Sequence, residues 1–275
     1  FGLLLSVGFS SIGFIAAITV TVLAAREVSN NPLFLGFPNA VGVGGAFLGT
    51  QMFYKISKKY SRLAALSLTF FVGALGSVVL FYSLIIDSFI LLMIGALILG
   101  FGQSATLQSR YAASFVASEK FKATALSLAV WFSVFGSVFG PRLVSVYSDY
   151  FDNLFNSELI VGYIVAMVGM LFASASVLTF TTSNSSLREP AEVEEVAEKA
   201  IESKKDGNIL TLLLVLNHFT MVVIMSATPL HVQDIGETVE LVGVIISYHT
   251  LGMFLLSPIL GNYVDKYGYK NFTYV

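Results

Sequence analysis

The sequence predicts an all-α polytopic membrane protein, from its long uncharged runs and its overall composition. Hydrophobic residues make up 56% of the 275 residues and charged residues 12%, whereas a soluble domain carries about 25% charged residues. A helix rising ~1.5 Å per residue needs about 20 apolar residues to cross the hydrocarbon, and eight runs without Asp, Glu, Lys or Arg reach or nearly reach that length. Strands of a membrane barrel would alternate apolar and polar residues, whereas Phe89 to Leu99 is apolar throughout. The runs span residues 1–25, 28–54, 63–86, 88–109, 123–141, 159–187, 207–233 and 241–264.

Positive charges gather in alternate loops between these spans. Twelve of the 15 Lys and Arg residues do so, which by the positive-inside rule predicts that these loops, including residues 182–206 and 261–270, are cytoplasmic. We expect a multi-pass protein of the inner or plasma membrane, with the lipid bilayer as its first partner. The twelve are Lys55, Lys58, Lys59, Arg62, Lys120, Lys122, Arg188, Lys199, Lys204, Lys205, Lys266 and Lys270.

The order of the spans predicts two bundles of unequal length. Residues 1–181 hold six spans, residues 182–206 form a polar cytoplasmic linker, and residues 207–275 hold two more spans and the following loop. Because the chain opens at Phe1 inside a span, without a visible signal peptide, we expect it to be truncated at both ends. Within the linker, apolar residues recur at helical spacing, which predicts a short amphipathic helix, either a brace between the bundles or an ordinary surface linker. Its apolar positions are Val193, Val196, Ala197, Ala200 and Ile201.

Two loops repeat a pattern. The loop from Tyr54 to Arg62, after the second span, aligns with the loop from Gly261 to Lys270, after the eighth; Lys59 and Tyr60 match Lys266 and Tyr267. Two parallel six-helix repeats would place corresponding loops at these positions.

The second loop resembles the major facilitator superfamily of secondary transporters. Its pattern, Gly-x-x-x-Asp-[Arg/Lys]-x-Gly-[Arg/Lys]-[Arg/Lys], is matched by Gly261, Asp265, Lys266, Gly268 and Lys270 but not by Tyr269. The resemblance implies that Asp265 forms a latch closing the cytoplasmic side; the alternative is that the lysines are only positive-inside anchors. An Asp at a helix N-terminus is favoured by the helix dipole. The first copy carries Lys58 in place of the Asp, so we expect the two halves to be gated unequally.

The fifth span carries a second resemblance. Gly136, Gly140 and Pro141 resemble the Gly-x-x-x-Gly-Pro element of the antiporter branch, although the usual trailing glycine pair is absent. Glycines one turn apart let another backbone approach, and a proline frees a carbonyl and bends the helix, so we expect a functional bend. Gly45 and Gly49 repeat the glycine spacing in the second span, where ordinary helix packing is the simpler interpretation. In the fourth span, Gly100-Phe101-Gly102 resembles its family counterpart, but Ala96 replaces the expected Arg.

Polar residues near the middle of the spans are the candidates for solute binding. Polar groups deep in a bilayer are costly, and the family fold places its site between the halves near the midplane. Arg110 is the candidate for an anionic group, with snorkelling or a gating ion pair as alternatives, and interior packing is an alternative for Trp131. Small hydroxyls of the first span (Ser6, Ser10, Ser11 and Thr19) are weaker candidates, because they commonly bond to their own helix. The main candidates are Asn39, Gln103, Arg110, Trp131, Asn217 and His218.

Histidines are the candidates for proton coupling. No carboxylate lies in the centre of a span, and His is the side chain whose ordinary pKa lies near neutrality. We therefore select His218 and His249, with a structural hydrogen-bonding role as the alternative; His231 lies near the predicted external mouth.

Several function classes have no support in the sequence. No phosphate-binding loop is present, the three histidines are too scattered for a metal site, cysteines are absent, and no basic patch suggests nucleic acid. We expect neither an enzyme nor a cofactor. The first hypothesis is a small-molecule exporter working by alternating access and proton exchange, its direction resting on Gly136 to Pro141. The alternatives are an importer of the same fold and a transport-inactive accessory subunit of a membrane complex.

Overall fold

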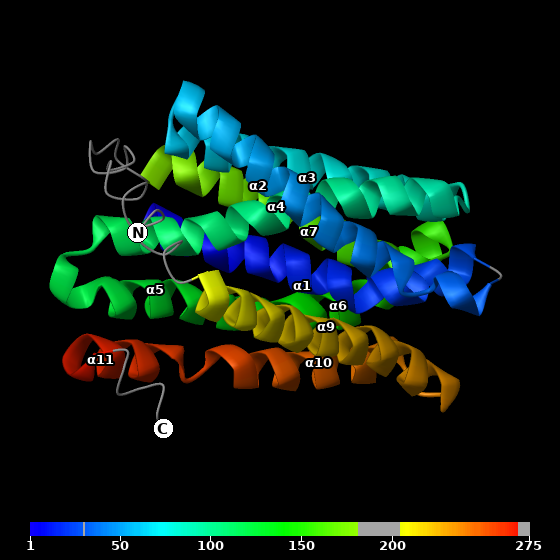
Figure 1. Ribbon diagram of the computed structural model, residues 1–275. Coiled ribbons are helices and arrows are strands. Elements are labelled where there is room, and N and C mark those ends of the chain that lie inside the picture. The colour runs from blue at the N-terminus through cyan, green and yellow to red at the C-terminus, as the bar shows by residue number, and fades with distance from the viewer. Residues whose placement is uncertain (30, 181–203, 269–275) are drawn as a thin grey trace.

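The computed structural model describes residues 1–29, 31–180 and 204–268. This part of the chain is helical, and eight of its helical stretches are long and apolar enough to cross a membrane, which confirms the predicted fold class (Figure 1). The long helices of the first bundle are α1 (Gly2–Val28), α2 (Phe37–Lys59), α3 (Arg62–Ile85), α4 (Phe89–Val116), α5 (Lys122–Trp131), α6 (Ser133–Phe155) and α7 (Ile160–Phe180). Those that follow are α9 (Lys204–Asp234), α10 (Val239–Phe254) and α11 (Ser257–Tyr267). Short 3-10 turns, η1 (Pro32–Phe34) and η2 (Glu119–Phe121), precede α2 and α5.

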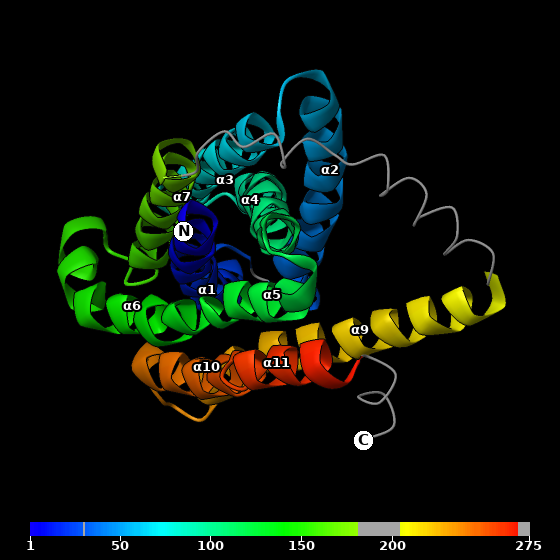
Figure 2. The same cartoon turned by 90° about the vertical axis from the view of Figure 1, so that its left-hand side faces the viewer.

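Helix α1 forms the centre of the first bundle and packs against α4, α6 and α7 (Figure 2). Small residues bring these backbones together. A Cβ atom added at Gly136 of α6 would lie 2.6 Å from the Ser11 carbonyl carbon, and one added at Gly169 of α7 would lie 2.6 Å from the Phe9 carbonyl oxygen. In hydrocarbon, where apolar side chains gain nothing by leaving lipid, such close approach is a main source of helix association.

Glycines also bring α2 and α3 close to the backbone of α4. A Cβ at Gly49 of α2 would lie 2.8 Å from Phe101 Cα, and one at Gly76 of α3 would lie 2.7 Å from the Ile98 carbonyl carbon. The glycine pair Gly45 and Gly49 therefore serves helix packing, as its simpler interpretation expects. Helix α4 is held closely on both sides, which fixes the face that carries Gln103.

The fifth and eighth spans are each divided into two helices. α5 ends at Trp131 and α6 begins at Ser133, and the Phe135 amide bonds to the Phe132 carbonyl at 3.2 Å in a tight turn. The break lies upstream of Pro141, where a bend was expected, and α6 continues through Pro141. The span extends to Phe155 rather than ending at residue 141. The eighth span is broken at Leu255 and Leu256, between α10 and α11.

Residues 261–267 are helical, whereas the sequence predicted a turn-forming loop. Gly261, Asp265 and Lys266 lie within α11, and Gly268 follows its end with a φ of 81°. Gly261 therefore serves packing and not turning, whereas Gly268 ends the helix with a positive φ that glycine adopts readily. Lys270 and the predicted amphipathic linker helix lie outside the described residues.

Helix α9 contacts the first bundle unevenly. Its start diverges from the other helices, whereas its second half lies beside α1 (Figure 2). Helices α10 and α11 run along α6 and α5, respectively. The helices α10 and α11 thus contact the first bundle along its α5 and α6 side, and α9 lines the cavity described below.

The contact between α1 and α6 gives a stability test. Gly136→Ala adds a methyl group where the Ser11 backbone leaves no room, so the helices must separate, at an expected cost of about 1–3 kcal/mol. Gly44→Ala in α2 is the matched control, because no described atom lies within 4 Å of its Cβ position. Thermal unfolding of the detergent-purified protein should show a lower Tm for Gly136→Ala alone. Equal Tm values for the two variants would contradict the packing account.

A candidate solute cavity and its two closures

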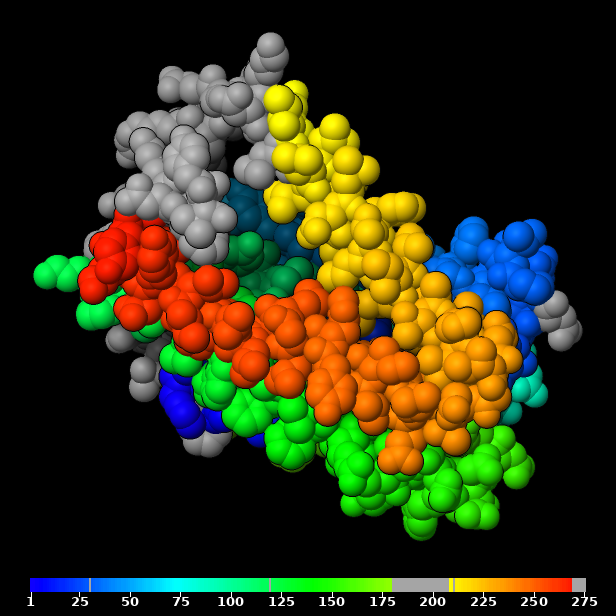
Figure 3. Space-filling view, turned by 90° about the horizontal axis from the view of Figure 1, so that it is seen from below, coloured from blue at the N-terminus to red at the C-terminus, as the bar shows by residue number. Residues whose placement is uncertain are grey.

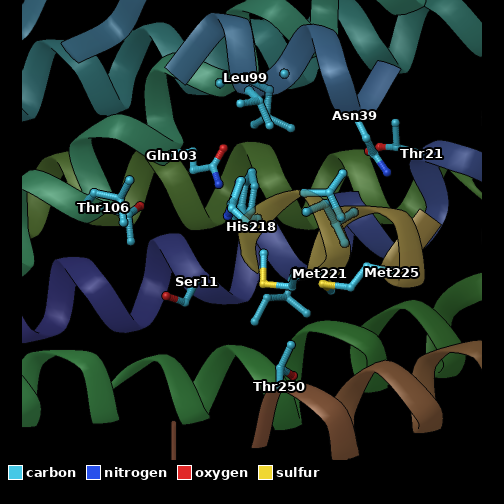
Figure 4. Close-up of a pocket in the computed structure, with 18 of the residues that line it drawn as sticks. Ser11, Thr21, Asn39, Leu99, Gln103, Thr106, His218, Met221, Met225 and Thr250 are labelled. Atoms are coloured by element: carbon cyan, nitrogen blue, oxygen red, sulfur yellow. The ribbon is translucent and has the colours of Figure 1, made fainter. Parts of the chain in front are cut away.

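Both sets of helices contribute to one cavity of about 400 Å³ (Figure 4). α1, α2, α3, α4 and α6 line it from the first bundle, and α9 and α10 line it from the other side. Most of the surface is apolar, with a few polar groups, as is usual for small-molecule sites. Five of the six main sequence candidates line it: Asn39, Gln103, Arg110, Asn217 and His218.

Arg110 is the charged residue of the described cavity lining. Its Nη2 atom donates to Ser133 Oγ at 2.7 Å, and Ser133 also accepts from Ser11 Oγ at 3.1 Å. The guanidinium carbon lies 5.4 Å from the ring centroid of Phe254, in range of a cation–π interaction. Its Nε atom is buried and has no hydrogen-bond partner among the described residues. Neither Ser133 nor Phe254 could be predicted from sequence as a contact of Arg110, because both lie on other spans.

Opposite side chains meet across the cavity. Gln103 of α4 and His218 of α9 point toward one another in Figure 4. Asn39 of α2 donates through Nδ2 to Ser226 Oγ of α9 at 2.8 Å, which ties the two bundles directly. Met221 and Met225 of α9 form an apolar wall beside these polar groups.

Two sequence candidates lie elsewhere. Trp131 packs edge-on against Phe132 and Phe135, with ring centroids 6.1 and 5.9 Å away, so the packing alternative describes its position. His249 is exposed on α10 and is absent from the cavity lining.

Of the four α1 hydroxyls considered as candidates, one lies at the cavity and three do not. Ser11 lines the cavity, whereas Ser6, Ser10 and Thr19 donate to carbonyl groups of their own helix. These bonds, at 2.8, 3.2 and 2.8 Å, satisfy the hydroxyls within the helix. Only one of the four hydroxyls is therefore available at the cavity surface.

Asp265 joins α11 to the start of α5. Its two carboxylate oxygens accept hydrogen bonds from the backbone N–H groups of Ala123 at 3.0 Å and Thr124 at 2.7 Å. The carboxylate therefore meets a helix N-terminus, as the sequence argument expects, but the N-terminus belongs to a helix of the other bundle. Anions are stabilised there by free N–H groups and by the helix dipole.

Gly261 permits this contact one turn earlier in α11. A Cβ at Gly261 would lie 2.6 Å from Ser127 Cβ and 2.7 Å from the Ala123 carbonyl oxygen. The Ser257 hydroxyl donates to the Ser127 carbonyl at 3.0 Å, which extends the same seam. Figure 3 shows α10 and α11 lying along the α5 and α6 side of the molecule.

Charged contacts join the helices at the opposite end. Arg26, in the last turn of α1, donates to Asp234 Oδ1 at 2.6 Å and to Gln233 Oε1 at 2.8 Å, at the end of α9. Arg142 of α6 lies 3.8 Å from Glu240 of α10. The sequence could not predict either pair, because partners over 90 residues apart leave no local pattern.

Fold and cavity define a polytopic helical membrane protein in which the first bundle and helices α9 and α10 together line a mainly apolar cavity with a few polar groups. The model of the Major Facilitator Superfamily matches residues 3–275, and the chain belongs to this family.

Named relatives agree with this assignment. The chain is 31% identical over 270 residues to an uncharacterised MFS-type transporter, YdeG, and 30% identical over 272 residues to another, YddS, both of Bacillus subtilis. Each alignment covers 94% of this chain and 63% or 62% of the relative, so the chain spans just under two thirds of their length. A riboflavin transporter, RfnT, of Brucella anthropi is 22% identical over 258 residues, covering 91% of this chain and 63% of that protein. No solved structure gave a significant match.

The seam between α11 and α5 predicts a steric effect. Gly261→Ala should force α11 away from α5 and expose the cavity at this end, because the new methyl group meets Ser127 and Ala123. Gly252→Ala is the control, with no described atom within 4 Å of its Cβ position. A cysteine introduced at Leu107 in the cavity wall, in the cysteine-free sequence, can report access to an impermeant maleimide. Faster labelling with Gly261→Ala alone is expected, and equal rates would contradict a closing role for the seam.

The carboxylate contact predicts an asymmetry between the two repeats. Asp265→Asn removes the charge from two hydrogen bonds at a helix N-terminus, which should weaken the closed state by roughly 1–3 kcal/mol. Lys58→Asn, at the matching position of the first repeat, should change the labelling of the same reporter much less, since Lys58 lies 4.5 Å from the Tyr54 ring of its own helix. Equal changes for the two variants would refute the asymmetry.

Proposed function

We propose that the chain is part of a secondary transporter that carries a small solute through the central cavity by alternating access. The observation that carries this proposal is the convergence of polar side chains from both bundles, Asn39, Gln103 and Arg110 on one side and Asn217 and His218 on the other. Such groups are costly in a membrane interior and are retained there for solutes, ions or protons. Binding between two bundles lets their relative movement expose the solute to each side in turn.

The contacts at the two ends suit such a cycle. Asp265 on the α5 N-terminus would close the predicted cytoplasmic end, and Arg26 with Asp234 would close the other end. Each closure consists of a few charge-assisted hydrogen bonds, so neither is too strong to break during a transport cycle. In the proposed cycle, one closure opens while the other holds.

His218 is the proposed proton-coupling residue. It lines the cavity, no Asp or Glu occurs in the described lining, and His changes charge near neutral pH. His249 is exposed on α10 outside the described cavity lining, so it is not proposed for coupling. Proton-coupled export remains the first proposal for direction, and it rests on the resemblance of Gly136, Gly140 and Pro141 to the antiporter element.

Import is the second candidate function. It is favoured by the unpaired cavity cation Arg110, which would attract a metabolite anion, and by the relative named as a riboflavin transporter. A transport-inactive accessory subunit would show no solute flux and a stoichiometric membrane partner on purification.

A histidine comparison tests coupling and direction together. The full-length protein, in liposomes containing a pH-sensitive dye, is challenged with a solute panel under an imposed pH gradient. His218→Ala should abolish solute-driven proton movement, whereas His249→Ala should keep it. Solute moving with or against protons distinguishes the two directions, and pH-dependent flux that survives in both variants would show that histidine coupling is wrong.

A further inference from the structure

The cavity holds a partly buried positive charge whose hydrogen-bonding capacity is not fully used. A guanidinium carries five N–H donors. Among the described residues, Arg110 donates one hydrogen bond, to Ser133 Oγ, and its Nε atom has no partner. No carboxylate of residues 1–29, 31–180 and 204–268 pairs with it. A buried charge without a counter-ion is unfavourable, so the free protein leaves a place for a bound anion.

Ser133 and Ser11 hold the guanidinium toward the cavity. Ser133 accepts from both Arg110 and Ser11, which orients the arginine without neutralising it. A carboxylate partner would have cancelled the charge, as Asp234 does for Arg26 at the end of α1. Simple snorkelling does not explain this arrangement, because the Nε atom is buried and the side chain lies in the cavity wall.

The rest of the wall is suited to an apolar body. Phe14, Phe254, Met221, Met225 and Met253 face the same cavity. Aromatic rings and flexible thioethers accept flat apolar groups of varied shape. A volume of about 400 Å³ suits a small organic molecule better than an inorganic ion.

We propose that the transported solute is an organic anion, with a carboxylate or similar group on Arg110 and an apolar, preferably flat, body against the methionine and phenylalanine wall. This inference rests on the proposed transport function. Gln103, near His218, would then hydrogen-bond polar substituents of the body (Figure 4). The charged group sets selectivity, because the described lining offers a cation no counter-charge.

Three probes of one shape test the proposal: 2-naphthoate, 2-naphthamide and 2-naphthylmethylammonium, with negative, zero and positive charge. Binding to the purified full-length protein is measured by calorimetry. Naphthoate should bind roughly ten- to hundredfold more tightly than the amide, the range expected for hydrogen bonds to a charged group. Arg110→Gln should remove this preference and Arg110→Lys should keep part of it. Lys55→Gln, at an exposed lysine of α2 outside this cavity, is the control and should change nothing.

The same probes separate failure of this inference from failure of the proposed function. Naphthoate binding that depends on Arg110, with no flux of any probe in liposomes, would support the anion site and count against transport. Flux of the amide or ammonium probe without an anion preference would support transport and overturn the anion site. Binding of no probe, or a preference that survives Arg110→Gln in a variant with normal elution and Tm, would also overturn it.

Discussion

The structure depends on the cost of unsatisfied polar groups in a hydrocarbon environment. Most hydroxyls of the spans meet this cost within their own helix: Thr69 donates to the Ala65 carbonyl at 2.7 Å and Thr21 to the Ala17 carbonyl at 2.7 Å. Helices whose polar groups are satisfied in this way can pack through glycine and alanine at backbone distance. Among the exceptions are Ser11, Ser133 and Arg110, which bond between helices in the wall of the cavity.

The role of the motif around Asp265 depends on the helix that it contacts. By itself the motif is a helix end with a glycine and an acid. Packed against α5, the glycine allows approach and the acid satisfies two N–H groups that have no partner within the first turn of their own helix. The first repeat, with Lys58 in the acid position, cannot accept hydrogen bonds from a helix start. The two halves of the molecule therefore differ in chemistry at positions that correspond in sequence.

Much of the fold followed from the sequence because span length and charge placement are local properties. The break at Phe132 was missed, since no charge or proline marks it. The break at Leu255 was missed although Ser257 and Pro258 follow it in the first turn of α11, because the uncharged run continues through both residues. In the site, Gln103 and Arg110 were found from their spacing on one helix, and Asn217 and His218 from their depth. Ser133, Phe254 and Asp234 were not found, because each acts through a partner on another helix, and one sequence carries no record of which faces meet.

The charges that line the cavity bear on whether a proton would move together with the solute or in exchange for it. If His218 takes up a proton near a bound anion, each stabilises the other, because opposite charges in a site of low dielectric attract strongly. Proton and anion would then cross together, whereas exchange requires them to compete. Competition needs an acid that either the proton or a cationic solute can neutralise, and the described lining of the cavity contains none. An anionic solute at Arg110 therefore supports the second candidate, import by cotransport, whereas the first, export by exchange, would need an acid outside the described cavity lining.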